Sequence, residues 1–447
     1  MRDIAITLIV IGLIPAILMR AHIGVLAWSW MAYMNPHRLT YGFAYSAPFS
    51  MIIGLTTIAA FLFSREPKHI PIMPMTVVWL LFVAWMSFTT LFALVPLDAE
   101  TAFIRMIKIQ LMIYISLALM YNKERLIQLV WVIVFSLGFY GFKGGIFSIT
   151  KGGEDIVWGP AGSFIEGNNE LALALIMTFP LMRFLHLNTT NKWIRWLLVC
   201  TMGLSLLSII FSYSRGAFLA IIAMGIVLVL KTRHKFLFIA LILVGVAIIL
   251  PYIPDKYTER MNTIKTYEED GSALGRINAW HFAYNLAKDR PIIGGGFQVF
   301  DPELFKKYAP IPDDFHDAHS IYFQVLAEHG FVGLFLFFTL LLMTFYNGYM
   351  VERLAKLHPD LIWARDLAAM AQVSIAGYMV GGAFLGLAYF DLPYHLMAIV
   401  VLLRMLVNKA LAEKGIDLMP EPPSFVRTAK TKNKQINPPQ ASSNKHK

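Results

Sequence analysis

The sequence predicts an all-α, polytopic membrane protein, and three observations lead to that fold class. Of the 447 residues, 57% are hydrophobic and only 15% are charged, whereas ordinary soluble domains carry about 25% charged residues. The mean hydropathy is +0.60. Apolar runs of about 17 to 25 residues recur along the chain, and each can cross ~30 Å of hydrocarbon as a helix.

The apolar runs set the expected number of crossings. They fall at about 4–19, 21–34, 44–63, 75–94, 102–120, 125–149, 168–187, 193–213, 216–231, 236–253, 331–349, 367–390 and 393–411. Because the second run is short and Pro15 interrupts the first, residues 1–34 form one broken crossing or two. The expectation is therefore 12 or 13 crossings, taken as about 12 transmembrane helices.

Lysine and arginine collect in alternate short loops, which predicts the orientation. These loops carry Arg65 and Lys68, Lys123 and Arg125, Lys192 and Arg195, Lys231, Arg233 and Lys235, and Arg353 and Lys356. The positive-inside rule places them in the cytoplasm. The other set then faces outward, at about 35–43, 95–101, 150–167, 212–216, 254–330 and 391–392. A cytoplasmic N-terminus would require residues 1–34 to cross only once.

The chain divides into a transmembrane domain over 1–411, with the outward loop of about 254–330 included, and a tail over 412–447. The tail is basic and poor in apolar residues, which predicts a disordered cytoplasmic segment. Its Lys430, Lys432 and Lys434 could contact anionic lipid or remain solvated. The net charge of +10 is interpreted as membrane topology, so no nucleic acid is expected as a partner.

The outward loop is predicted to contain one amphipathic helix. Ser272 is a suitable N-cap for a helix from Ala273 to Lys288 that ends before Pro291. Arg276 and Trp280 then share one face of that helix. The run of glycines at 294–296 is expected to be a flexible turn, and it lacks the context of a nucleotide-binding loop.

A polar cluster at 313–320, with two histidines and three aspartates, lies at the edge of an apolar span. His319 begins a predicted helical stretch at the outer interface, where it could accept a proton, contact a lipid headgroup or cap the helix. Glu328 falls on the opposite helix face and is expected to pair with a basic neighbour. A metal site at His316, Asp317 and His319 has no evident fourth ligand, so no metal is predicted.

Two further sets of basic residues lie on the outward side. Arg215 occupies a tight turn against the orientation rule, and its guanidinium group either snorkels or binds a diphosphate through paired hydrogen bonds. Arg105 and Lys108 lie on one face near the outer end of the 102–120 run. They either snorkel or face the interior or the headgroup zone, where they could attract a lipid phosphate.

Several motifs together resemble the O-antigen ligase/polymerase superfamily. They are Ser-Arg-Gly-Ala at 214–217, Gly275-Arg276 opening a helix, His319-Ser320 followed by Glu328-x-Gly330, and Gly162-Ser163-Phe164 before Asn168-Asn169. The stretch from Asn35 to Ala44 is similar to the subgroup of exosortase-associated O-glycosylation ligases. The resemblance covers about residues 1–411.

That resemblance implies a metal-independent, inverting glycosyltransferase of the GT-C class that needs no cofactor. The implied donor is a glycan on undecaprenyl diphosphate in the outer leaflet of the bacterial inner membrane. The acceptor would be lipid A-core, another glycan or a protein. Matched motif by motif, His319 would be the base, and Arg215 and Arg276 would bind the diphosphate. Asn169, Glu328 and His316 would have supporting roles.

Two alternatives stay open. An O-antigen polymerase or a protein O-oligosaccharyltransferase would share the same motifs and differ only in the acceptor. A transporter of lipid-linked glycans would also have many spans, but it should place charged residues along a path through the bilayer. Here the unusual polar residues gather on one side, which favours the enzyme.

Overall fold

The computed structural model describes residues 1–416, except 69, 233–234 and 263–270. The predictions for Arg233 and for the tail from residue 417, with its three lysines, therefore lie outside the described residues. Residues 1–407 form one compact unit, and a second unit begins at residue 408. The described residues form helices and no strand, which confirms the all-α class for that part of the chain.

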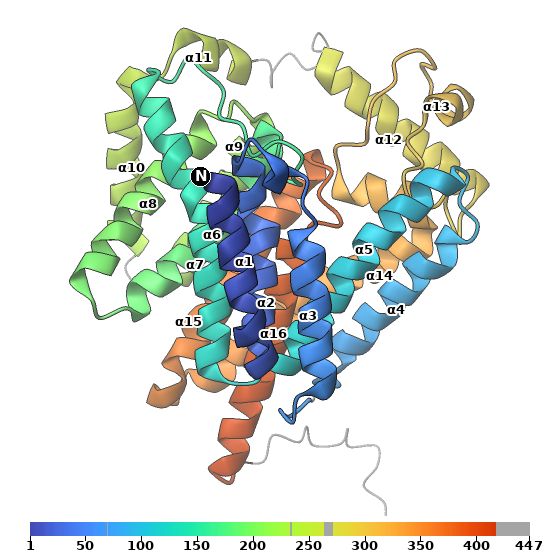
Figure 1. The fold of residues 1–447 in the computed structure, drawn as a ribbon. Coiled ribbons are helices and arrows are strands. Elements are labelled where there is room, and N and C mark those ends of the chain that lie inside the picture. The colour runs from blue at the N-terminus through green and yellow to red at the C-terminus, as the bar shows by residue number, and fades with distance from the viewer. Residues whose placement is uncertain (69, 233–234, 263–270, 417–447) are drawn as a thin grey trace, which may run out of the picture. The chain divides into compact units, whose positions relative to one another are not determined.

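Sixteen α-helices and several short 3-10 helices are described (Figure 1). The α-helices are α1 (Arg2–Met19), α2 (Ala21–Met34), α3 (Phe49–Phe63), α4 (Pro74–Thr90), α5 (Pro96–Leu119), α6 (Lys123–Thr150), α7 (Asn168–Asn188), α8 (Lys192–Ile210), α9 (Arg215–Lys231), α10 (Lys235–Ile249), α11 (Asp255–Asn262), α12 (Gly271–Asp289), α13 (Pro302–Tyr308), α14 (Ile321–Ala355), α15 (Ile362–Gly381) and α16 (Asp391–Glu413). The 3-10 helices include η1 (Pro36–Leu39), η2 (Phe43–Tyr45), η5 (Pro359–Leu361) and η6 (Gly382–Phe384).

Eight of the described helices are long and apolar enough to cross a membrane, namely α1, α5, α6, α7, α8, α14, α15 and α16. Helices α3 and α4 are apolar but shorter. Helices α2, α9 and α10 also coincide with predicted apolar runs and have 14, 17 and 15 residues. At 1.5 Å rise per residue a helix of this size spans only about 20 to 25 Å. The eight long apolar helices support a polytopic membrane protein.

The first two helices run in opposite directions. The Asp3 carboxylate at the start of α1 accepts hydrogen bonds from the backbone N–H groups of Gly42 and Ala44, at 3.0 and 3.1 Å. Arg2 donates to the carbonyl oxygen of Leu39 at 3.3 Å. The chain start thus lies beside the segment that follows α2. Residues 1–34 form two antiparallel helices, and the N-terminus lies at the same end as the 35–43 loop.

The loops predicted to face outward meet at one end of the first unit. The N–H of Leu94 donates to the carbonyl oxygen of Gly295 at 2.8 Å, which joins the loop before α5 to the long loop. The Tyr213 hydroxyl donates to the carbonyl oxygen of Gly153 at 2.7 Å. The loops expected in the cytoplasm meet in the same way at the other end, where Arg125 pairs with Glu66 at 2.6 Å. The predicted alternation of the loops is therefore present in the fold.

Helix α14 consists of two helical pieces that meet at Gly330, whose φ of 69° and ψ of −170° are not helical. The glycine turn at 294–296 packs against this kink. Gly295 and Gly296 donate to the carbonyl oxygens of Ala327 and Glu328, each at 2.8 Å. These bonds satisfy carbonyl groups that the kink leaves without helical partners. The prediction of a flexible turn was wrong, because its backbone is hydrogen-bonded to α14.

Helices α12 and α13 of the long loop lie next to each other (Figure 1), and they share an apolar core that also includes Ala327 of α14. Phe282 of α12 stacks on Phe305 of α13 with ring centroids 5.0 Å apart. Helix α12 begins at Gly271, so Ser272 lies in its first turn, and the predicted N-cap at Ser272 was wrong. This core fixes α12 as a rigid support for the chain that leads to His319.

Candidate active site

Helix α12 holds the segment before His319 through two side chains. The Asn278 amide donates to the carbonyl oxygens of Ile311 and Asp314, at 2.8 and 3.1 Å, and accepts from the N–H of Ile311 at 3.0 Å. The indole N–H of Trp280 donates to the carbonyl oxygen of Ala318 at 2.8 Å. Polar side chains of α12 therefore fix the backbone up to the residue next to His319.

His319 precedes α14 and does not begin it. Its φ is +42°, in the left-handed region that residues other than glycine rarely adopt. Ser320 occupies the N-cap position of α14 without a side-chain capping hydrogen bond. Such backbone conformations cost roughly 1–3 kcal/mol and cluster at functional sites. The turn rotates the half-buried imidazole out of the helical register that the sequence predicted for it.

The electrostatic surroundings of His319 keep its imidazole neutral. Burial lowers the pKa of His319 from its ordinary value of 6.5, and the positive charge of Arg276 lowers that pKa further. The carboxylate of Asp317 acts in the opposite direction and is the smaller effect. A neutral imidazole at pH 7 can accept a proton, so the environment suits a general base.

Arg276 lies on α12 at the point where the His319 segment packs against that helix. A Cβ at the preceding Gly275 would approach the His316 ring to 2.2 Å, so only glycine leaves room for the segment. The Arg276 charge acts on His319 and also on the Glu170 carboxylate near the start of α7. Arg276 is therefore close enough to His319 for its charge to lower the pKa of the imidazole.

Arg215 is the first residue of α9, immediately after a buried polar turn. The Ser214 side chain caps the helix by accepting from the N–H of Ala217 at 3.1 Å. The Asn168 amide, at the start of α7, donates to the carbonyl oxygen of Ser212 at 2.7 Å. The first turn of α7 is thus tied to the turn that presents Arg215. The half-buried Asn169 was the predicted supporting residue, but the hydrogen bond to the turn is made by its neighbour.

The segment 382–390 joins these parts, and the sequence analysis missed it. A Cβ at Gly216 would lie 3.1 Å from the Cβ of Phe384, so α9 packs closely on this segment. The Phe384 ring also lies against Trp280 of α12, with centroids 6.5 Å apart. Farther along, a Cβ at Gly386 would come within 4.0 Å of the His319 Cα. One irregular segment therefore contacts the helices of both arginines and the histidine.

The apolar run at 367–390 was predicted to be a single crossing, and that prediction was wrong at its end. Helix α15 stops at Gly381, and a 3-10 turn and an irregular stretch follow before α16. The glycines at 381, 382 and 386 were the available signal, because glycine is unfavourable within helices. Because the rest of the run at 367–390 is apolar, hydropathy alone predicts that the helix continues through the break.

A cavity of about 310 Å³ opens beside this segment. Its lining residues come from α5, the loop between α6 and α7, the long loop, α14 and the 382–390 segment, and are Asp98, Thr101, Ala102, Arg105, Met106, Ile109, Phe164, Phe297, Gln298, Gln324, Gly386, Leu387, Tyr389 and Phe390. The Arg105 guanidinium lies over the Phe164 ring at 5.6 Å. Arg105 thus lines the cavity, whereas Lys108, on the same helix, is not among its lining residues; both side chains are exposed.

Glu328 is buried beside this cavity, and its partners differ from the prediction. Its carboxylate accepts from the N–H of Gln298 at 3.0 Å and from the hydroxyl of Tyr389. Neither partner is basic, so the expected pairing with a cation was wrong. Two cavity residues are instead held in place by one carboxylate. Glu328 therefore fixes the positions of Gln298 and Tyr389 in the cavity wall.

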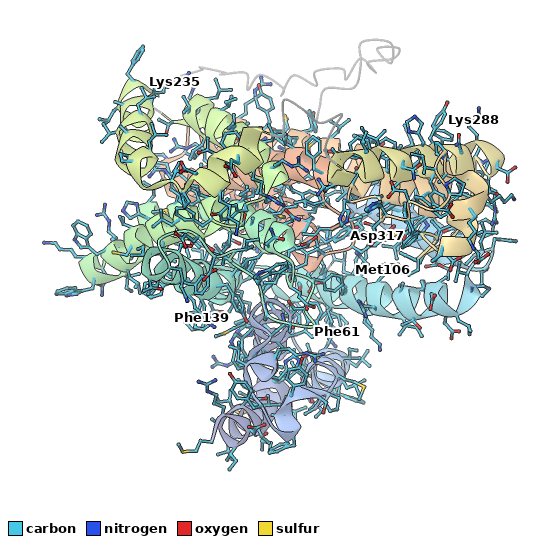
Figure 2. All side chains as sticks on the ribbon, turned by 90° about the horizontal axis from the view of Figure 1, so that it is seen from above. Phe61, Met106, Phe139, Lys235, Lys288 and Asp317 are labelled. Atoms are coloured by element: carbon cyan, nitrogen blue, oxygen red, sulfur yellow. The ribbon has the colours of Figure 1, made fainter. Side chains whose placement is uncertain are left out.

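His316 lies at the surface of the same loop. Its Nε2 atom is 3.0 Å from the Asp314 carboxylate, and 37% of its side chain is exposed. Among the described residues, no group of three or more His, Cys, Asp or Glu side chains is arranged to hold a metal ion. In the view of Figure 2, the label of Asp317 lies close to that of Met106 of α5, and those of Lys235 and Lys288 lie farther out.

Comparison with known families gives two matches. Residues 1–190 match a family of unknown function (DUF5935), a range that includes Arg105, Lys108 and Asn169. Residues 200–338 match a family described as O-antigen ligase, a range that includes Arg215, Arg276, His319 and Glu328. No curated protein matches the chain. The match over residues 200–338 shows that this part of the chain is similar to the O-antigen ligase family.

Proposed function

We propose that the protein is an inverting, metal-independent glycosyltransferase of the GT-C class, close to the exosortase-associated O-glycosylation ligases. It moves a glycan from undecaprenyl diphosphate to an acceptor hydroxyl, and the acceptor we propose is lipid A-core, with O-antigen as the glycan. The O-antigen ligase match supports this assignment. The observation that carries it is the lowered pKa of the half-buried His319, which burial and the positive charge of Arg276 cause.

In this proposal the site faces the periplasm and the protein lies in the bacterial inner membrane. The end of the fold opposite the site collects the basic loops, which the positive-inside rule assigns to the cytoplasm. With α1 and α2 antiparallel, the N-terminus lies on the periplasmic side, and the two helices count as separate crossings. With 13 crossings, the odd one of the two numbers expected from the sequence, the C-terminus then lies in the cytoplasm.

The proposed reaction is a single displacement. The acceptor hydroxyl gives its proton to His319 while its oxygen forms a bond to the anomeric carbon. The bond from that carbon to the diphosphate oxygen breaks on the opposite face, and undecaprenyl diphosphate leaves with the electron pair. Attack opposite the leaving group inverts the anomeric configuration. A positioned base of this kind typically contributes 10²–10⁴-fold to the rate.

Arg215 and Arg276 would stabilise the diphosphate as negative charge develops on it. A guanidinium group can donate two parallel hydrogen bonds to phosphate oxygens. Both arginines lie on helices whose positions are fixed by packing against the 382–390 segment. Donors held in place before the reaction need no reorganisation during it. Stabilisation of the transition state by such preorganised donors is the largest contribution to catalysis in many enzymes.

The cavity beside Tyr389 would receive a sugar next to the bond that reacts. Its volume of about 310 Å³ is at the lower end of the range for ligand pockets, which suits one or two sugar rings. Asp98, Thr101 and Gln298 supply polar groups, and Phe164 and Phe390 supply ring faces. Arg105, which also lines it, would contact a donor phosphate.

Reconstitution tests the proposal directly. The purified protein in liposomes, supplied with glycan on undecaprenyl diphosphate and with lipid A-core, should transfer the glycan to the core. Deletion of the protein in its host should then leave lipopolysaccharide without polymer. Shortened polymer would indicate a polymerase instead, and loss of protein glycans alone would indicate a protein acceptor. Movement of the donor across the bilayer without transfer would indicate a transporter.

The pH profile of transfer should follow the lowered pKa of His319. Because burial and Arg276 lower that pKa below 6.5, the imidazole stays neutral from pH 8 down to its ordinary titration range. The rate is therefore expected to be constant over this interval and to fall only below pH 6.5, as the base becomes protonated. Initial rates in liposomes between pH 5 and 8 measure this. A decline with its midpoint above pH 7 would contradict the assignment.

A further inference from the structure

A second, larger cavity lies at the end of the fold away from His319. Its volume is about 910 Å³. Its lining residues come mainly from α7, α9, α14 and α15, and are Arg183, Leu187, Lys231, Thr232, Leu237, Tyr349, Glu352, Arg353, Lys356, Arg365, Asp366, Ala369 and Met370. The last turn of α9 and the C-terminal end of α14, both at the basic end, contribute to it. The reaction proposed above makes no use of this cavity.

The cavity is strongly positive. Five of its lining residues are basic and two are acidic. Both acidic groups already have cationic partners, because Glu352 pairs with Lys231 and Asp366 pairs with Arg365 at 2.6 Å. The lining residues therefore carry a net charge of +3. An anion that entered the cavity would meet acidic groups that are already neutralised.

Arg183 shows that this charge is more than the basic rim expected of a cytoplasmic loop. It lies five residues before the end of α7, roughly 7 Å inside the helix at 1.5 Å per residue. Its neighbours Met182 and Phe184 are buried, whereas the half-buried Arg183 lines the cavity. A charge within a membrane helix is costly and normally faces a polar cavity with a ligand or partner.

Apolar side chains lie next to these charges. Leu187, Tyr349 and Leu237 line the same cavity and are 50%, 55% and 62% exposed, respectively. A free inorganic anion would use the basic groups and leave this apolar surface uncovered. A molecule with a phosphate at one end and a hydrocarbon chain at the other would cover both.

We propose that this cavity binds the headgroup phosphate of an anionic glycerophospholipid from the leaflet at that end of the fold. Arg183 and Arg353 bind the phosphate oxygens through charge-assisted hydrogen bonds, and an acyl chain lies along the exposed leucines and Tyr349. Basic pockets between membrane helices on the cytoplasmic side are suited to such headgroups. The proposal does not depend on the reaction at the opposite end.

Lipid binding to the full-length protein tests this proposal. Native mass spectrometry of the protein in detergent, titrated with phosphatidylglycerol, should show one copy that binds about tenfold more tightly than phosphatidylcholine does. Removal of one charge near a phosphate is expected to weaken that copy roughly fivefold. Arg183→Gln and Arg353→Gln should each do so, and Arg183→Lys should bind more tightly than Arg183→Gln.

The matched control is Arg65→Gln, which removes an exposed arginine at the same end, outside the cavity. It should leave phosphatidylglycerol binding unchanged. Arg353 is exposed on α14, so its variant keeps the test valid if the Arg183 variant fails to fold. Equal binding of both lipids, or equal weakening by Arg65→Gln, would overturn the proposal. So would complete displacement of phosphatidylglycerol by millimolar inorganic phosphate, since the apolar surface would then contribute nothing.

Discussion

Replacement of His319 by alanine is expected to abolish glycan transfer, with a rate loss of about 10²–10⁴-fold. The reason is that the variant cannot take the proton of the acceptor hydroxyl, while Arg276 and the rest of the site remain. Initial rates in liposomes measure the effect, and the melting temperature of the purified variant shows whether it folds. Because His319 has a φ of +42°, a second variant, His319→Asn, is informative. Asparagine tolerates this backbone conformation better than alanine does, yet it supplies no base.

The matched control for His319 is His316→Ala. It removes the same residue type from the same loop, where the histidine is 37% exposed and contacts Asp314. We expect this variant to keep most of its rate. Transfer at the normal rate by both His319 variants would exclude His319 as the base. Equal loss in the His316 variant would point to the loop as a whole.

The parts of the site that could be predicted are those with a local chemical signal. Arg215 departs from the orientation rule, and His319 stands in a polar cluster beside an apolar span, so both could be found without coordinates. The roles of Arg276 and His319 followed from the resemblance, and the positive charge of Arg276 lowers the pKa of His319. Most of the helices could be predicted because their apolar runs are long.

The parts that could not be predicted depend on contacts between distant residues. The direction of α1 is fixed by the bonds of Asp3 to Gly42 and Ala44, and neither hydropathy nor charge near the N-terminus reports such bonds. The partners of Glu328 are a tyrosine 61 residues away and the backbone of Gln298. The break after Gly381 lies within a continuous apolar run, so composition alone extends the helix through it. In each case hydrophobicity favours helix or span, and specific hydrogen bonds or close packing decide the outcome.

Arg276 and Arg215 are expected to differ in a way that separates binding from catalysis. Arg276→Ala should lower the transfer rate by about 10²-fold, the usual loss for one preorganised donor, and Arg276→Lys should lose less, because lysine keeps the charge but not the paired hydrogen bonds. In the alanine variant the charge that lowers the His319 pKa is also gone. The acid limb of the pH profile should therefore move to higher pH.

Arg215→Ala should also weaken use of the donor and raise its apparent KM, but it should leave the acid limb in place, because burial, Arg276, Asp317 and His316 account for the pKa of His319. Rates at several donor concentrations between pH 5 and 8 distinguish the two variants. If alanine and lysine at position 276 caused equal losses without any shift of the limb, Arg276 would be a packing residue. A shift of the limb by Arg276→Ala alone would place that guanidinium near the base, and a larger loss of rate with alanine than with lysine would support its role at the leaving diphosphate.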